Sequence, residues 1–187
     1  MTATSGDLPV GPGWAFEVVW GGARTTLEIR DGGLIVRDGA GQDVTALYPE
    51  FAVQADGVED AVLDGEVIGA DGHPVDHPQD PDRREVPAVF LLVDVLRLYG
   101  VDLVDRPFVE RRATLQRLAE AHPSWTLPPA FDDAAATLAA AHEHGLAGVV
   151  AKRLDSRYRP GSASPDWVFC KLPAPPVKEE PTPWQTR

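Results

Sequence analysis

Three acidic residues interrupt apolar stretches in which a charge is costly to bury. Asp64 and Glu66 flank Gly65, and Asp94 lies within the apolar run 89–96. Alternate residues of a strand face the same side, so Asp64 and Glu66 could hold a divalent cation or contact a ribose. The alternative for this pair is an acidic turn between two strands. Burying an unpaired carboxylate costs several kcal/mol, so Asp94 needs a basic partner, a backbone group to cap or a place beside a site.

Lysines, which could act as nucleophiles or bind phosphate, are scarce, and two of them end apolar stretches. Lys152 follows residues 148–151, and Lys171 follows residues 166–170. Because neighbouring residues of a strand face opposite sides, at most one of Lys152 and Arg153 can serve an interior site. The alternative for each stretch is an ordinary strand that ends in a solvated lysine.

A metal site near the two histidines of residues 71–78 is disfavoured by their spacing. His73 and His77 lie close to Asp71 and Asp76, but this pattern matches no closed zinc site and no cysteine is near. We therefore expect a loop without a metal in this region.

The composition indicates one globular domain with an acidic surface. The chain has 187 residues, of which 43% are apolar, and a net charge of −12. Direct DNA binding by such a chain alone is not expected, because phosphate contacts require clustered Lys and Arg. A single cysteine excludes an internal disulfide, and neither a signal peptide nor an apolar run of about 18 residues is present. We expect a cytoplasmic protein without membrane contact.

The pattern of apolar residues and turns predicts an α+β domain. A buried strand from residue 14 should run into a turn at Gly21 and Gly22, and strand 61–70 should be interrupted at residues 64–66. Residues 43–51 should form a short helix or an irregular connection, and residues 71–85 a loop. Further strands are predicted over residues 24–30, 34–37, 86–98, 149–154 and 166–172, and helices over 107–122 and 132–144. Residues 1–13 are expected to be an N-terminal extension, 14–172 the domain, and 173–187 a disordered tail rich in proline and charge.

Taken in order, these segments resemble the adenylation (nucleotidyltransferase) domain of ATP-dependent DNA ligases, particularly the bacterial end-joining type. The resemblance extends from about residue 14 to residue 171. It rests on six ordered motifs, at residues 14–18, 63–66, 94 with 100–103, 107–115, 148–156, and 158–161 with 167.

The resemblance implies an ATP-grasp-like fold of mixed and antiparallel sheets with flanking helices. It also implies nick sealing in DNA repair and recombination, with ATP and Mg²⁺ as cofactors. In that family, a lysine in a Lys-x-Asp-Gly motif attacks the α-phosphate of ATP and carries AMP to a DNA end. The chain stops before the oligonucleotide-binding-fold domain of such ligases, so no such domain is expected.

Several positions of the family's site carry other residues in this chain. Val19 occupies the nucleophile position, and Gly21 replaces the aspartate of the same motif. Val93 replaces an aromatic residue that stacks on adenine, Ala147 replaces an acid, and Phe169 replaces a lysine. Among the matching positions, the resemblance assigns nucleotide contacts to Glu17, Arg24, Arg37, Lys152 and Lys171, and metal contacts to Asp64, Glu66 and Asp94.

A valine cannot form a lysyl-adenylate, so the sequence predicts a catalytically inactive ligase-like domain. The apolar replacements are expected to close the nucleotide pocket, and the remaining acids to repel ATP. Such a domain would serve as a binding or scaffold domain, and its partner would be an active repair ligase or another repair protein. Two alternatives stay open: a nucleotidyltransferase that uses a displaced lysine, for which Lys152 and Lys171 are the structured candidates, and an acidic protein-interaction module unrelated to nucleotides.

Overall fold

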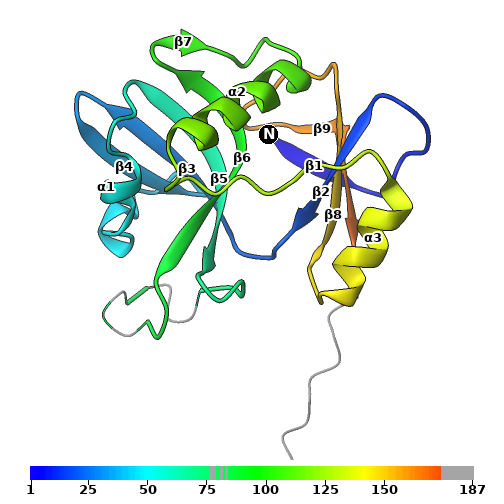
Figure 1. The fold of residues 1–187 in the computed structure, drawn as a ribbon, viewed down its shortest axis with the longest axis horizontal. Coiled ribbons are helices and arrows are strands. Elements are labelled where there is room, and N and C mark those ends of the chain that lie inside the picture. The colour runs from blue at the N-terminus through cyan, green and yellow to red at the C-terminus, as the bar shows by residue number, and fades with distance from the viewer. Residues whose placement is uncertain (76–78, 81, 83, 174–187) are drawn as a thin grey trace, which may run out of the picture.

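Two β-sheets, each with helices packed on it, make up the computed structural model, which describes residues 1–75, 79–80, 82 and 84–173 (Figure 1). The smaller sheet has the order β1–β9–β8–β2, formed by Thr2–Ser5, Ala163–Lys171, Gly148–Arg153 and Trp14–Val19. The larger sheet has the order β4–β3–β5–β6–β7, formed by Gly33–Asp38, Ala23–Arg30, Ala61–Gly69, Ala88–Leu98 and Val101–Asp102. Neighbouring strands are antiparallel except β1 and β9, which confirms the predicted α+β class with mixed sheets.

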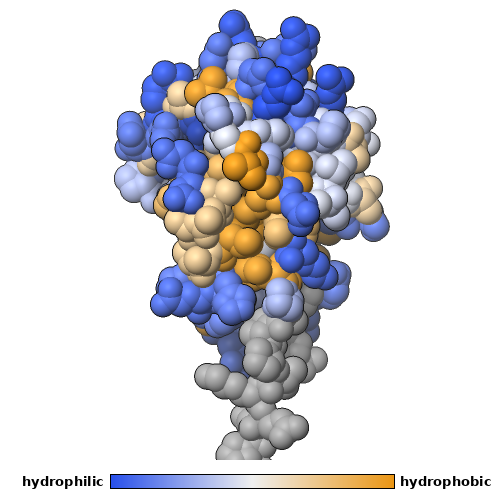
Figure 2. Space-filling view, turned by 90° about the vertical axis from the view of Figure 1, so that its right-hand side faces the viewer, coloured by the Kyte–Doolittle hydropathy of each residue, from blue (hydrophilic) through white to orange (hydrophobic). Residues whose placement is uncertain are grey.

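Each sheet has its own apolar core beneath a helix. Helix α2 (Phe108–Ala121) packs on β6, where Leu115 and Leu118 join the main core of the larger sheet. Helix α3 (Ala134–Glu143) packs on β2 and β8 over a smaller core that includes Phe16. Apolar residues also gather on the outside of the molecule, on the face that carries α3 (Figure 2). Within the described part of the chain, no helix is long and apolar enough to cross a membrane.

The predicted helices begin and end at the expected signals. Pro107 is the N-cap of α2, where its missing N–H is harmless, and the Asp133 side chain accepts a hydrogen bond from the backbone N–H of Ala136 at the start of α3. Gly145 follows α3 with a φ of +66°. The connection at residues 43–51 contains a short 3₁₀ helix, η1 (Thr45–Leu47), and a single helical turn, α1 (Phe51–Gln54), begins at its end.

Three elements differ from the sequence prediction. Strand β5 is continuous through Asp64 and Glu66, so both the predicted interruption and the alternative of an acidic turn are wrong. The pairing of β5 with β6 shifts twice near these acids, between Val62 and Leu63 and between Asp64 and Gly65. The glycine leaves room for Phe90, because a Cβ at Gly65 would lie 2.1 Å from that ring. Strands β1 and β7 had not been predicted, since both are short and weakly patterned.

A three-residue connection, residues 20–22, carries the chain from β2 of the smaller sheet to β3 of the larger one. Gly21 has a φ of +87°, a conformation that favours glycine. A Cβ at Gly22 would lie 2.1 Å from the carbonyl oxygen of Val67 on β5, so this position requires the absence of a side chain. The predicted glycine turn is therefore confirmed, and it brings the two sheets together around one cavity.

Candidate functional site

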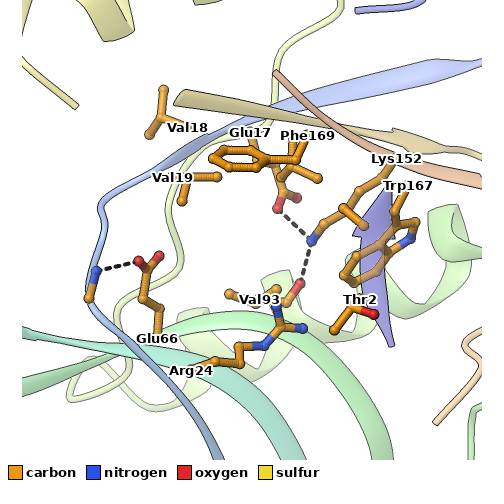
Figure 3. A pocket seen from close by; sticks show the side chains of 13 residues that line it. Thr2, Glu17, Val18, Val19, Arg24, Glu66, Val93, Lys152, Trp167 and Phe169 are labelled. Atoms are coloured by element: carbon orange, nitrogen blue, oxygen red, sulfur yellow. Dashed lines mark hydrogen bonds and ion pairs between the residues drawn. The ribbon is translucent and has the colours of Figure 1, made fainter. Parts of the chain in front are cut away.

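A cavity of about 300 Å³ lies between the two sheets, at the point where the chain crosses from one to the other (Figure 3). The smaller sheet contributes residues from all four of its strands, and the larger sheet contributes residues from β3, β5 and β6. The lining residues are Thr2, Ala3, Glu17, Val18, Val19, Gly22, Arg24, Glu66, Val93, Val150, Lys152, Trp167 and Phe169.

Apolar side chains lie in the cavity wall at the positions to which the resemblance assigns reactive or nucleotide-binding groups. Val19, Val93 and Phe169 all line the cavity (Figure 3). The expectation that this apolar bulk would close the pocket is wrong, because the cavity persists beside all three side chains. These residues therefore change the chemistry of the wall rather than fill the space.

Lys152 is fully buried and held by several partners. Its Nζ lies 2.6 Å from Glu17 Oε2 and donates a hydrogen bond of 2.8 Å to the carbonyl oxygen of Val93 (Figure 3). The ammonium also lies 4.4 Å from the centroid of the Trp167 ring and 4.9 Å from that of Phe108. The prediction that only one of the paired cations faces inward is confirmed: Arg153 is 51% exposed and points to the other side of β8.

Glu17 joins this lysine to a second cation. Arg112 on α2 donates from Nη1 to Glu17 Oε1 over 3.1 Å, so each carboxylate oxygen of Glu17 faces its own positive charge. Arg112 also donates to the backbone carbonyl of Pro128. Because burial makes charges expensive unless they are paired, this network neutralises the cavity's buried lysine.

Arg24 and Asp64 form a second neutralised pair at the opposite side of the cavity. The Arg24 guanidinium donates from Nε and Nη2 to the two oxygens of Asp64, and the Tyr158 hydroxyl donates to Oδ2 over 2.7 Å. Burial alone would lower the pKa of Arg24, but the charge and hydrogen bonds of Asp64 raise it above the ordinary value. Arg24 therefore remains charged and tied to Asp64.

The buried Tyr158 hydroxyl should make the folded state sensitive to alkaline pH. Burial first, and the Asp64 carboxylate second, raise the pKa of Tyr158 above its ordinary value of 10.0. Above about pH 10 the unfolded chain loses a proton that the folded chain keeps, so stability should fall by up to about 1.4 kcal/mol per pH unit. Below about pH 10, Tyr158 is protonated in both states and does not make the free energy of unfolding depend on pH.

Urea unfolding between pH 9 and 11.5 would measure this effect, with Tyr158→Phe as the comparison. The variant should show a shallower loss of stability, although some slope should persist because burial also raises the pKa of Tyr48. Equal slopes in the two proteins would contradict the assignment.

Glu66 differs from the other acids because backbone groups hold it. Its Oε1 accepts a hydrogen bond of 2.6 Å from the backbone N–H of Gly22 (Figure 3). Its Oε2 accepts a longer one of 3.4 Å from the backbone N–H of Trp20. Among the residues that the structure describes, no ion pair to Glu66 is present. Glu66 thus fastens the crossing connection to β5 and leaves a negative charge at the cavity wall.

The three predicted metal ligands do not gather into one site. Asp64 is occupied by Arg24 and Tyr158, and Asp94 by both Nε and Nη2 of Arg111, at 2.8 Å each. No group of three His, Cys, Asp or Glu side chains suited to a metal is found in the described residues. Asp64 and Asp94 are therefore already paired with arginines, and Glu66 is held by backbone N–H groups, so these three acids do not fit Mg²⁺ as arranged here.

Two predicted nucleotide contacts lie away from the cavity. Arg37 pairs with Glu28 at 2.7 Å, and Lys171 is exposed at the end of β9. Neither residue lines the cavity, whereas Glu17, Arg24 and Lys152 do. Of the two histidines considered for a metal site, His77 lies outside the described residues.

Sequence reasoning gave no role to several residues that build this site. Thr2 and Ala3 line the cavity from β1, within the segment taken as an extension, because a short run of small polar residues carries no strand signal. Arg111 and Arg112 lie within the motif at residues 107–115, to which the sequence assigns no site residue. Their helical neighbours Phe108 and Leu115 face the core, so a helical wheel would have placed both arginines on or beside the buried face.

The fold and the position of the cavity define a class of protein: the chain belongs to the ATP-dependent DNA ligase domain family. The family model matches residues 9–171. A curated relative, the multifunctional non-homologous end joining DNA repair protein LigD of Mycobacterium tuberculosis, is 38% identical over 160 residues. That alignment covers 83% of this chain and 21% of the relative, so the chain spans about a fifth of LigD.

Solved structures support the same assignment. The ligase domain of M. tuberculosis LigD matches with a TM-score of 0.79 and 36% identity, over 90% of this chain and 57% of that one. A mycobacterial DNA ligase D complexed with ATP and MES matches with a TM-score of 0.76 and 35% identity, over 90% of this chain and 59% of that one. The predicted family, its bacterial end-joining type and its nucleotidyltransferase fold are thereby confirmed.

Proposed function

We propose that this chain is a ligase-fold domain that has lost self-adenylation and acts as a binding or scaffold domain in DNA end-joining repair. The observation that carries this proposal is that Val19, to which the resemblance assigns the nucleophile position, lines the cavity with a hydrocarbon side chain. A hydrocarbon side chain has no lone pair with which to attack a phosphate. The repair setting rests on the similarity to LigD, which is an end-joining repair protein.

The surroundings of Lys152 argue against a displaced nucleophile. Attack requires a neutral amine free to approach phosphorus, but this ammonium is ion-paired with Glu17, bonded to the Val93 carbonyl and enclosed by two rings. Lys171 is exposed at a strand end outside the cavity. A nucleotidyltransferase based on either lysine is therefore disfavoured.

Incubation with α-labelled ATP and Mg²⁺, followed by denaturing electrophoresis, tests the loss of chemistry. We expect no covalent label on this chain, while a LigD ligase domain treated in parallel becomes labelled. A label that survives denaturation would overturn the proposal.

Restoring the two missing motif residues, by Val19→Lys with Gly21→Asp, should not recover activity. We expect labelling below about one hundredth of that of an active ligase domain, because Val93, Ala147 and Phe169 still fail to position the nucleotide. Gly21→Asp should also cost about 1–2 kcal/mol, since φ is +87° and a Cβ would lie 3.2 Å from that of Ala147. The same labelling assay measures activity, and urea unfolding measures the cost. Labelling close to that of the active domain would show that Val19 and Gly21 alone block the reaction.

We further propose a cytoplasmic location and a repair protein, such as an active ligase, as the partner. The net charge of −12 favours a protein partner over direct contact with DNA. A pull-down with the tagged chain, compared with the same experiment after DNase treatment, would separate protein contacts from contacts made through DNA.

A further inference from the structure

A groove of about 440 Å³ lies between the β6–β7 hairpin and α2, and it shares no lining residue with the cavity between the sheets (Figure 1). The two elements contribute mostly apolar residues to it, namely Leu98, Tyr99, Val101, Leu103, Thr114, Arg117, Leu118 and Ala121. Leu98 and Leu118 are buried, whereas Tyr99 and Val101 are 56% and 54% exposed. The groove therefore has an apolar floor that belongs to the core and an apolar rim that faces solvent.

Tyr99, on this rim, has a backbone conformation that its residue type disfavours. It begins the two-residue turn between β6 and β7, and its φ of +48° lies in the left-handed region, where Gly, Asn and Asp are preferred. Backbone hydrogen bonds from Tyr99 to the carbonyl of Glu59 and from Gly100 to that of Asp60, of 3.3 and 3.2 Å, hold this conformation. Among the described residues, the Tyr99 side chain makes no hydrogen bond and no ring contact. The fold explains the turn but not the tyrosine, and an exposed ring on a strained turn indicates contact with another molecule.

Arg117 supplies the second recognition group of the groove. Among the described residues that line the groove, only Arg117 is charged. Its Nη2 donates to the hydroxyl of Thr114 over 3.2 Å, and no ion pair to it occurs in the part of the chain that the structure describes. A guanidinium in this position is available to a carboxylate of another molecule. Tyrosine and arginine are also the residues that most often contribute strongly to protein–protein binding.

The α2 side of the groove indicates the length of segment that fits. Thr114, Arg117, Leu118 and Ala121 follow the spacing i, i+3, i+4 and i+7, so they form one stripe along two turns of the helix. Such a stripe is about 10 Å long. A helical segment of similar length presents apolar side chains one turn apart on one face, which is the common way for a peptide to occupy an apolar groove.

We propose that this groove binds an amphipathic segment of a partner protein, about three helical turns long, that carries a carboxylate beside its apolar face. The apolar side chains of the segment lie on Leu98 and Leu118 under the Tyr99 ring, and its carboxylate pairs with Arg117. The rest of the segment is basic or neutral, because the chain as a whole has a net charge of −12. The inference rests on the proposed binding role and deepens it by naming the surface and the chemistry of the partner.

Fluorescence anisotropy with three labelled synthetic peptides tests the proposal. The first peptide forms a helix with leucines along one face, lysines on the opposite face and a single glutamate at the edge of the leucines. The second has glutamine in place of that glutamate, and the third has serines in place of the leucines. We expect the first to bind about two- to fivefold more tightly than the second and at least about tenfold more tightly than the third.

Tyr99→Asn is the decisive variant, because asparagine suits the left-handed conformation and lacks the ring. We expect it to weaken the first peptide at least about tenfold and to raise the melting temperature by about 2 °C. Loss of a residue needed only for the fold would lower the melting temperature instead. The control is Val10→Asn, at a residue that is 97% exposed and outside the groove, which should leave the affinity unchanged.

Arg117→Gln tests the contact with the carboxylate. It should bring the affinities of the first and second peptides together, because the glutamate then loses its partner. The matched control is Arg159→Gln, which removes the same charge from an exposed residue outside the groove and should leave the ratio of the two affinities unchanged.

The outcomes separate this inference from the loss of adenylation. Equal binding of the three peptides, no binding of any of them, or a Tyr99→Asn variant that binds as the unsubstituted chain does would overturn the inference and leave that loss standing. Self-association that Tyr99→Asn abolishes would assign the groove to a second copy of the chain and would also overturn the inference. Covalent labelling by ATP in the same preparations would overturn the loss of adenylation itself.

Discussion

Replacing Arg111 with alanine should lower the free energy of unfolding by about 3–5 kcal/mol. The side chains of Arg111 and Asp94 are both 0% exposed, and two hydrogen bonds of 2.8 Å join them. Arg111 also donates from Nη1 to the backbone carbonyls of Arg106 and Ser156, which ties α2 to the segment after β8. The variant leaves the buried carboxylate of Asp94 without its cation, so we expect it to lose more stability than any other substitution proposed here.

Urea unfolding followed by circular dichroism would measure this loss. The control is Arg106→Ala, whose exposed pair with Glu110 spans 3.7 Å and should contribute at most about 0.5 kcal/mol. If Arg111→Ala does not fold, the double variant Asp94→Leu with Arg111→Met should recover most of the stability, because it removes both buried charges. A loss below about 1 kcal/mol in the single variant would contradict the buried pair.

Replacing Gly22 with alanine should lower the free energy of unfolding by about 2–3 kcal/mol, the second largest effect that we expect. An added Cβ would lie 2.1 Å from the carbonyl oxygen of Val67 and 2.7 Å from a methyl group of Ile68. The backbone must shift to relieve this overlap, and that shift moves the N–H that Glu66 holds at 2.6 Å. The crossing connection and the cavity wall should loosen together.

Gly33→Ala is the matched control for this variant. A Cβ there has its nearest neighbour at 3.4 Å, so the change should stay within about 0.5 kcal/mol. Thermal and urea unfolding of both variants measure the difference. Equal effects at the two positions would show that the crossing connection tolerates a side chain and is not tightly held.

The strands and helices were largely predictable because their signals are local. Residues 14–19, 24–30 and 88–98 alternate or run apolar between turn residues, and α2 and α3 begin at recognisable caps. The acids of β5 were misjudged, since an isolated sequence pattern cannot show that Arg24, Tyr158 and a backbone N–H will satisfy them. Contacts with residues distant in the chain therefore determine that β5 continues through Asp64 and Glu66.

The sequence predicted which residues line the cavity better than it predicted whether the cavity is open and how its charged residues are paired. The motifs placed Val19, Val93 and Phe169 at one cavity, and the structure does the same. They could not show whether the cavity stays open, because that depends on how the two sheets are spaced. The motifs also could not show that Lys152 forms an ion pair with Glu17, because the two residues lie 135 positions apart in the chain.

The loss of self-adenylation is the central claim, and intact-mass spectrometry after incubation with ATP and Mg²⁺ tests it most directly. The account predicts that the mass of the chain stays unchanged, while a LigD ligase domain in the same buffer gains one adenylyl group. A gain of that group by this chain, abolished in Lys152→Ala or Lys171→Ala, would contradict the account and identify the lysine that reacts.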